Sequence, residues 1–229
     1  MPSKISLDRP LGRRILPENS IPSFTRSYAI LDDVSSRKSK GLERIGNWLS
    51  LALLLGAVGS AAFVYWRWEY REQRFDRLIE EIAPKYGVDK FLVKAVIRRE
   101  SRFNPFACGT HGEIGLMQVT DGAGQQWARA VGRRDYGPSL LWDERVNIEV
   151  GSWYLARGLN RWPDKEPDER IAFALAEYNA GFANVLRWLP HGRQTTADEF
   201  VAAITFPTVR DYVTDVMESY RFYRARGHL

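Results

Sequence analysis

The chain has 229 residues, with 33 lysines and arginines against 28 aspartates and glutamates, so its formal net charge is +5. A hydrophobic fraction of 45% excludes a disordered chain and predicts one folded domain of ordinary size. The single cysteine, Cys108, excludes an internal disulfide, and with only three histidines it argues against a zinc site.

The first two segments in chain order are a polar tail and an apolar run. Residues 1–44 carry mixed charge without sustained periodicity, so we expect them to be disordered. Residues 45–66 contain no ionisable side chain. A helix of that length, rising about 1.5 Å per residue, crosses a hydrocarbon core of about 30 Å. Because a long polar segment precedes the run, we interpret it as an uncleaved transmembrane anchor rather than a cleaved signal peptide or a buried core helix.

Charge separates the tail from the rest of the chain. Residues 1–44 hold nine basic and five acidic side chains, whereas residues 67–229 hold 24 and 23. A nearly neutral domain lacks the electrostatic footprint of a nucleic-acid binder, so we expect no nucleic-acid partner. Arginines and lysines flank the apolar run closely on both sides, and the positive-inside rule therefore does not orient it.

The segments after the anchor show helical periodicity. Apolar residues from Phe75 to Ile82 predict an amphipathic juxtamembrane helix over residues 67–87 that joins the anchor rigidly to the domain. Asp89 is expected to cap a new helix. Further helices are predicted over residues 125–131, 146–159, 170–179, 183–189 and 209–223, with loops over 163–169 and 190–198. Without a run of alternating strands or an internal repeat, the fold class is mainly α.

Glu100 is the first candidate for chemistry. It follows Val93, Val96 and Ile97 by seven, four and three residues, which places its carboxyl on the apolar side of its helix. Desolvation favours the neutral form of a carboxyl, so we expect its pKa to be raised from about 4.3 and the group to donate a proton near neutral pH. The alternative is a structural glutamate that pairs with a neighbouring arginine of the same helix.

Several short motifs follow Glu100-Ser101 along the chain. They are Asn104-Pro105, Gly115-Leu116-Met117-Gln118, Asn147-Ile148 with Gly151 and Tyr154-Leu155, and Tyr178-Asn179-Ala180-Gly181. With these motifs in this order, residues 75–225 resemble the lytic transglycosylases of the soluble-lytic-transglycosylase-like family, which has the SLT domain and is related to goose-type lysozyme. The resemblance implies a lysozyme-like domain, here preceded by a single transmembrane helix.

The resemblance also implies a reaction. Glu100 would be the single catalytic acid and base at the β-1,4 bond between N-acetylmuramic acid and N-acetylglucosamine, giving a 1,6-anhydro product without water, cofactor or metal. Most glycosidases instead use two carboxylates. Glu113 and Glu177 are possible second carboxylates, but neither falls on a position that the family reserves for one, and Glu177 stands where alanine is usual.

The remaining candidate residues are predicted to bind substrate. Gln118 has an amide that both donates and accepts, as an acetamido sugar requires. Gly115 removes a side chain where the glycan approaches, and Met117 offers adaptable apolar contact. The alternative for Met117 and for Leu116 is core packing, and for Leu116 we favour it.

Four polar residues have two readings each. Tyr178 is expected to hydrogen-bond near Glu100 or the sugar, and Asn179 to bind the acetamido group or to tie loops together. Ser101 either bonds the acid or caps local backbone. Tyr212 borders the glycan or its peptide stem in one reading and packs structurally in the other, which is narrowly favoured.

Together these features predict a peptidoglycan lytic transglycosylase of the bacterial inner membrane. It would be anchored by residues 45–66, with the catalytic domain in the periplasm and its substrate the peptidoglycan glycan strands. A free Cys108 is tolerable in that oxidising compartment if its thiol is buried, as is common for free cysteines. Two alternatives stay open: a hydrolytic muramidase, and a catalytically weak peptidoglycan-binding scaffold with protein partners in an envelope complex.

Overall fold

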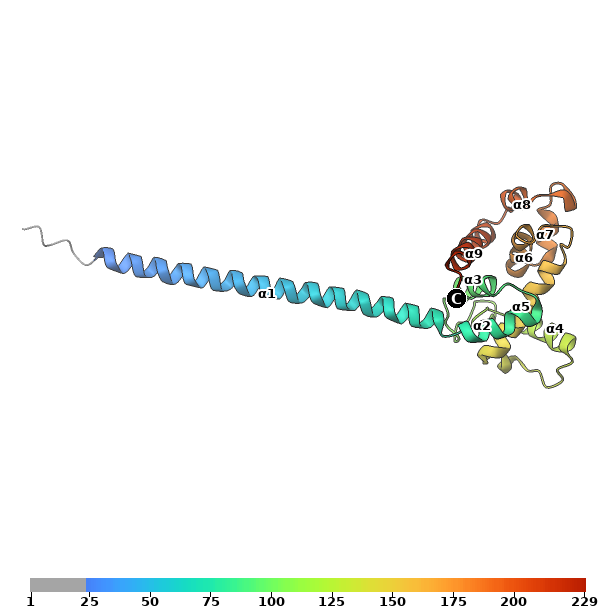
Figure 1. Cartoon of the computed structure of the whole chain (residues 1–229), viewed down its shortest axis with the longest axis horizontal. Coiled ribbons are helices and arrows are strands. Elements are labelled where there is room, and N and C mark those ends of the chain that lie inside the picture. Colours follow the sequence, from blue (N-terminus) through green and yellow to red (C-terminus); the bar gives the residue numbers. More distant parts are fainter. Residues whose placement is uncertain (1–23) are drawn as a thin grey trace, which may run out of the picture. The chain divides into compact units, whose positions relative to one another are not determined.

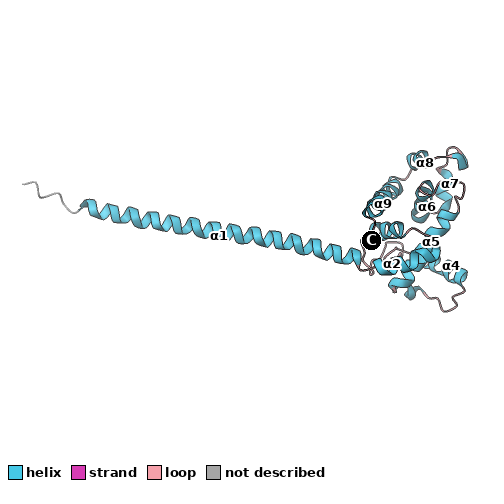
Figure 2. Cartoon of the chain, in the orientation of Figure 1, coloured by secondary structure: helices cyan, strands magenta, loops and turns pink. Residues whose placement is uncertain are grey.

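The computed structural model describes residues 24–229, with side chains described from residue 47 onward. Within this part of the chain Figure 2 shows helices and loops and no β-strand. The chain divides into two compact units between Ala62 and Phe63, and each is described by itself. The mainly α fold class predicted from the sequence is confirmed.

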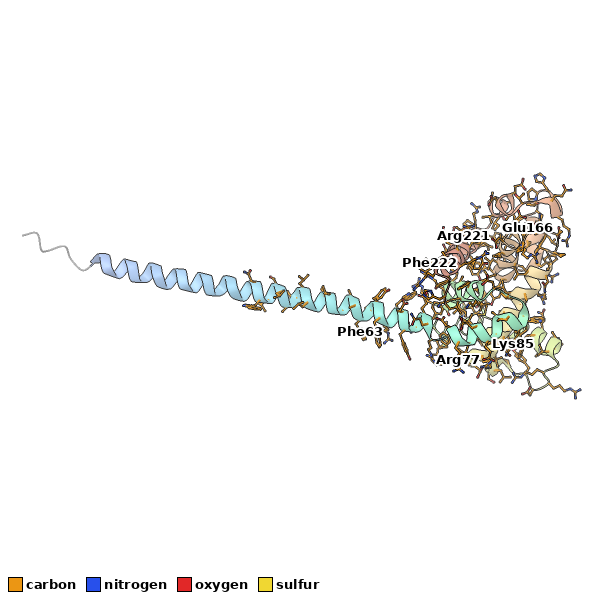
Figure 3. All side chains as sticks on the ribbon, in the orientation of Figure 1. Phe63, Arg77, Lys85, Glu166, Arg221 and Phe222 are labelled. Atoms are coloured by element: carbon orange, nitrogen blue, oxygen red, sulfur yellow. The ribbon has the colours of Figure 1, made fainter. Side chains whose placement is uncertain are left out.

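The helix of the first unit is α1 (Phe24–Gln73), which continues into the second unit and runs from blue to cyan in Figure 1. From Asn47 onward, the length and composition of α1 are sufficient for a helix that crosses a membrane. No other helix in the described residues meets this criterion. Leu53 and Phe63 on α1 are exposed rather than packed, and Figure 3 labels Phe63. These observations agree with the anchor predicted over residues 45–66.

The tail prediction differs from the structure in part. Residues 1–23 lie outside the described part of the chain, but residues 24–44 are helical rather than irregular. No proline lies between Pro22 and Pro84, so nothing in this stretch breaks a helix sterically. Extending an existing helix costs less than nucleating a new one, which explains why α1 continues upstream of the apolar run.

The juxtamembrane segment, predicted as one helix over residues 67–87, is broken in the structure. α1 ends at Gln73 and is followed by α2 (Asp76–Ile82) and the short 3₁₀ helix η1 (Ala83–Tyr86). Phe75 stands at the break and is 1% exposed, so the chain turns where this ring enters the core. The predicted apolar face is therefore confirmed, while the single continuous helix is wrong.

Loops connect the helices of the rest of the second unit, and the longest of them, over residues 102–120, joins α3 to α4. These helices are α3 (Lys90–Ser101), α4 (Asp121–Val131), η2 (Pro138–Trp142), α5 (Glu144–Asn160), α6 (Glu169–Ala180), α7 (Phe182–Arg187), η3 (Gly192–Gln194), α8 (Ala197–Ala203) and α9 (Pro207–Arg226). Each helix predicted after residue 88 overlaps one of them. The sequence analysis missed α8, which begins inside the segment predicted as a loop over residues 190–198.

Helix α3 is the element that positions the site. Asp89 caps it as predicted, because its side chain accepts a hydrogen bond from the Phe91 backbone N–H at 2.8 Å. Arg102 and Phe103 end it with positive φ angles of 50° and 59°. The buried ring of Phe103 compensates this strained turn. α3 packs mainly against α9, and α6 packs against both α5 and α9.

Candidate active site

Glu100 lies in the last turn of α3 with its side chain half-buried. Val93, Val96 and Ile97 on the same face are fully buried, which confirms the predicted apolar side of this helix. The hydroxyl of Tyr212, on α9, donates a hydrogen bond to Glu100 Oε1 at 2.7 Å. The carboxyl is therefore held between two helices that are far apart in sequence.

Burial raises the pKa of Glu100 from its ordinary value of 4.5 to about 7. The Tyr212 hydrogen bond and the nearby Arg99 guanidinium both lower this pKa, and the charge of Glu113 raises it, but all are smaller effects than burial. The predicted rise is thus confirmed, and so is its cause. A carboxyl with a pKa near 7 can both give and accept a proton at neutral pH.

The alternative of a structural ion pair on α3 is not what the structure shows. Arg99 pairs with Asp215 through Nε and Oδ2 at 3.1 Å, and Arg98 donates to the Tyr223 hydroxyl at 3.4 Å. Among the described residues no salt bridge to Glu100 is formed, and Arg102 at the end of the helix is exposed. The arginines of this helix thus point to other partners and leave the acid without a cation in contact.

Tyr178, on α6, lies beside Glu100 but bonds elsewhere. Its hydroxyl donates to the Met117 backbone oxygen at 2.7 Å, and its ring meets that of Tyr154 edge-on at 5.8 Å. Burial and the nearby Glu100 carboxylate raise the pKa of Tyr178 well above its ordinary value of 10. The phenol therefore stays protonated, and it connects α6 to the loop that holds Met117.

That loop is fixed by Asn147, a buried residue of α5. Asn147 Oδ1 accepts from the Met117 backbone N–H at 2.8 Å. Its Nδ2 donates to the backbone oxygens of Ile114 and Leu141, both at 2.8 Å. The sequence motif contained Asn147, but sequence reasoning gave it no role, because nothing local predicts that one amide satisfies three backbone groups of two other segments.

Gly115 lies against this amide, which is by itself a reason for glycine here, and its predicted closeness to the glycan stays a prediction. A Cβ on Gly115 would lie 2.3 Å from Asn147 Nδ2, and the residue has a φ of +77°. The side chain of Met117 is completely buried, which agrees with the core-packing alternative for this residue. The core packing favoured for Leu116 agrees with its complete burial. These residues thus shape the loop from inside.

Gln118 lies near the end of the loop over residues 102–120 and has a left-handed backbone conformation, with a φ of +45°. Its Nε2 donates to the backbone oxygens of Ala107 at 3.1 Å and Gly115 at 2.9 Å. Both amide protons are therefore used within the protein. The described residues donate no hydrogen bond to its Oε1, so the acceptor half of the amide is free for a ligand.

A cavity of about 250 Å³ lies next to this loop. Its lining residues come from the loop, α4, α5 and α6 and are Gln118, Val119, Thr120, Gly122, Ala123, Gln126, Tyr154, Glu177, Tyr178 and Gly181. Of the residues predicted to bind substrate, the structure brings Gln118 and Tyr178 together here, with Glu100 close to Tyr178.

Other predicted binding residues have different positions. Tyr212 is 2% exposed and bonds the acid, so it positions Glu100 rather than bordering the glycan. Ser101 Oγ donates to the Ile97 backbone oxygen at 3.2 Å, which agrees with its local reading. Asn179 is exposed and makes no hydrogen bond with the described residues, so it does not tie loops together.

The two possible second carboxylates are both engaged by the protein. Glu113 Oε2 accepts from the His111 backbone N–H at 2.9 Å. Glu177 is 1% exposed, and its Oε1 pairs with Arg161 Nε at 2.9 Å, while Oε2 has no protein partner. Within the described residues no group of three or more histidine, cysteine or acidic side chains lies together for a metal. Cys108 is exposed, so the condition that its thiol be buried is not met.

A helical domain with a half-buried acid close to a tyrosine that lines a cavity of sugar-ring size is typical of the lysozyme-like class. Residues 77–201 match the Transglycosylase SLT domain, and the chain belongs to this family. The family resemblance drawn from the sequence motifs is therefore confirmed.

Curated relatives cover this domain but are much longer than the chain. The "Membrane-bound lytic murein transglycosylase F" of Desulfosudis oleivorans is 39% identical over 116 residues, which are 50% of this chain and 24% of that protein. The "Soluble lytic murein transglycosylase" of Salmonella typhimurium is 31% identical over 69% of this chain and 24% of its own length. The chain thus spans about a quarter of the length of these two relatives.

Solved structures give the same fold. An inactive mutant of lytic transglycosylase Slt from Pseudomonas aeruginosa matches with a TM-score of 0.61 and 26% identity, covering 67% of this chain and 24% of that one. A complex of the 70-kDa soluble lytic transglycosylase with bulgecin A matches with a TM-score of 0.60 and 27% identity, covering 73% and 27%. The predicted lysozyme-like transglycosylase fold is confirmed.

Replacing Glu100 by glutamine is expected to stabilise the protein at alkaline pH. The folded protein keeps the proton of Glu100 up to about pH 7, whereas the unfolded chain releases it near 4.5. The wild type therefore loses stability as the pH rises through this window. Denaturant unfolding of the detergent-solubilised chain should show Glu100→Gln more stable than wild type by up to about 3 kcal/mol at about pH 8, and nearly equal to it at about pH 4.

Glu113→Gln is the matched control for this experiment. Hydrogen bonds lower the pKa of Glu113, so its ionised form stabilises the fold, and Glu113→Gln should become less stable relative to the wild type as the pH rises. An equal effect of Glu100→Gln at both pH values would contradict the raised pKa.

Asn147→Ala is expected to destabilise the domain by about 3 kcal/mol, because it removes three hydrogen bonds to backbone groups in a buried site. The control is Asn184→Ala, which removes two local hydrogen bonds, one to the Ala180 backbone oxygen and one from the exposed Arg187 side chain, and should cost about 1 kcal/mol or less. Unfolding free energies of both variants test this. Equal losses would show that Asn147 does not hold the loop.

Proposed function

We propose that this chain is a membrane-anchored lytic transglycosylase that cleaves the β-1,4 bond between N-acetylmuramic acid and N-acetylglucosamine in peptidoglycan. The observation that carries the proposal is the half-buried carboxyl of Glu100, with a pKa of about 7 and one hydroxyl donor. The names of the relatives support the reaction class, as does a solved relative described as inactive after a single Glu-to-Gln substitution.

Glu100 would act first as acid and then as base. Its proton passes to the glycosidic oxygen, and the C1–O bond breaks. The resulting carboxylate then takes the proton of the muramic acid C6 hydroxyl, whose oxygen bonds to C1 and closes the 1,6-anhydro ring. The Tyr212 hydroxyl stabilises the carboxylate between the two steps, because its hydrogen bond favours the ionised form.

A mechanism in which an internal hydroxyl is the nucleophile needs no second carboxylate. This agrees with the structure, where Glu113 and Glu177 are bonded to other groups of the protein. Arg161 holds Glu177, and a backbone N–H holds Glu113. In a hydrolytic enzyme one of them would have to activate water or attack the sugar. All the steps use groups of this chain and of the substrate, so the mechanism calls for no cofactor or metal.

The cavity beside Glu100 would hold a sugar ring. The free Oε1 of Gln118 is placed to accept the N–H of an acetamido group, since its amide protons are already used. Tyr178 and Tyr154 supply ring edges for the apolar face of the sugar. Asn179, exposed beside Tyr178, is free to bind the substrate from outside.

The proposed location follows from the substrate. Peptidoglycan lies outside the cytoplasmic membrane of bacteria, so residues 45–66 would cross the inner membrane once and place the catalytic domain in the periplasm. Residues 1–44 would then face the cytoplasm. The apolar stretch of α1 and the membrane-bound relatives support this arrangement.

Digestion of purified sacculi by the full-length chain tests the proposal. The wild type should release muropeptides with anhydro ends, about 18 Da lighter than the hydrolytic products, as read by mass spectrometry. Glu100→Gln should slow this release by at least about 100-fold, because it removes the general acid. Glu166→Gln is the control, since Glu166 lies in the exposed loop before α6, where Figure 3 labels it, and its release rate should not change.

Two outcomes would contradict the proposal. Products with reducing ends alone would mean a hydrolytic muramidase. No release by the wild type, together with equal binding of sacculi by wild type and Glu100→Gln, would mean a peptidoglycan-binding scaffold.

A further inference from the structure

A second cavity, of about 610 Å³, lies where the end of α1, α3 and α9 meet. Its lining residues are Trp68, Arg98, Arg99, Arg102, Asp215, Glu218 and Ser219. None of these residues lines the cavity beside Gln118 and Tyr178. The proposed reaction does not use this cavity, and its walls carry three arginines.

The covalent structure of α1 places one wall of this cavity close to the anchor. The uncharged run ends at Trp66, and Trp68 follows two residues later on the same uninterrupted helix. At a rise of about 1.5 Å per residue, Trp68 lies about 3 Å further along the axis. When residues 45–66 span a membrane, Trp68 is therefore at the level of the lipid headgroups, where tryptophan is enriched.

The charges of the cavity are only partly neutralised. Asp215, on α9, pairs with Arg99 at 3.1 Å. Arg98 donates to the Tyr223 hydroxyl, and neither Arg98 nor Arg102 forms a salt bridge with the described residues. Glu218 likewise has no ion-pair partner among them. The cavity thus offers two guanidinium groups without a counter-ion, one free carboxylate and the Ser219 hydroxyl.

A ligand that fits these groups carries both an anion and hydrogen-bond donors. Guanidinium groups bind phosphate oxygens in a forked geometry, and a carboxylate accepts from an ammonium or a hydroxyl. A phospholipid headgroup has a phosphodiester and, in ethanolamine or glycerol headgroups, such a donor.

We propose that this cavity binds the headgroup of a membrane phospholipid, with the phosphodiester on Arg98 and Arg102 and the polar end of the headgroup at Glu218 and Ser219. The proposal rests on residues 45–66 lying in a membrane. Because the same helix α3 carries Glu100, a bound lipid would fix the height of the acid above the bilayer.

Native mass spectrometry of the delipidated full-length chain in detergent micelles tests this site. The chain is titrated with dioleoyl phosphatidylglycerol, dioleoyl phosphatidylethanolamine, dioleoylglycerol without phosphate, and inorganic phosphate. We expect one phospholipid molecule to bind per chain. The wild type should bind it at least about tenfold more tightly than Arg98→Gln/Arg102→Gln, since this variant loses two charge-assisted contacts. Dioleoylglycerol should bind all variants alike.

Two further variants keep the test decisive. Arg129→Gln/Arg134→Gln makes the same charge change at exposed positions away from the cavity and should bind phospholipid like the wild type. Arg102→Glu alters one exposed side chain, so it should weaken binding without unfolding the domain. Melting temperatures establish that each variant is folded.

The proposal is overturned if the cavity variants and the wild type bind phospholipid equally, or if Arg129→Gln/Arg134→Gln weakens binding as much. Tight binding of inorganic phosphate in place of lipid would also overturn it, because the ligand would then be a free anion. Release of muropeptides from sacculi by solubilised Arg102→Glu should equal that of the wild type. Loss of the lipid site is thereby separated from failure of the proposed catalytic function.

Discussion

The carboxyl of Glu100 is subject to two opposing effects, and the site depends on which is larger. The Tyr212 hydroxyl donates to it at 2.7 Å and favours the carboxylate, while the surrounding core disfavours any charge. Burial is the larger effect, so the pKa rises to about 7. A fully hydrated glutamate with the same hydrogen bond would remain ionised at neutral pH and could not act as an acid.

The rest of the domain maintains this balance. Packing of α3 against α9 brings Glu100 and Tyr212 together across 112 residues of sequence. On the other side of the acid, Tyr178 bonds Met117, and Asn147 bonds the same backbone unit, so α5 and α6 both fix the loop that ends at Gln118. Two separate sets of hydrogen bonds thus position Glu100 and the loop that carries Gln118.

Local periodicity in the sequence predicted those features of the site that depend on a single helix. The apolar face of α3, the cap at Asp89 and the raised pKa of Glu100 follow from spacing within about a dozen residues. The roles of Tyr212, Gly115 and Asn147 do not, because each depends on contacts between segments remote in sequence. The sequence therefore predicted these residues only as substrate contacts or as parts of a motif. It did not predict that they hold the acid and the neighbouring loop in place through contacts in the core.

The pKa of Glu100 tests the central claim most directly. Carbon-13 NMR of the side-chain carboxyls in the detergent-solubilised, Glu-labelled full-length chain, with Glu100→Gln to assign the resonance, would follow its titration. The account predicts a midpoint of about 7. A midpoint at or below the ordinary value of 4.5 would show that the carboxyl is effectively hydrated and would contradict the account.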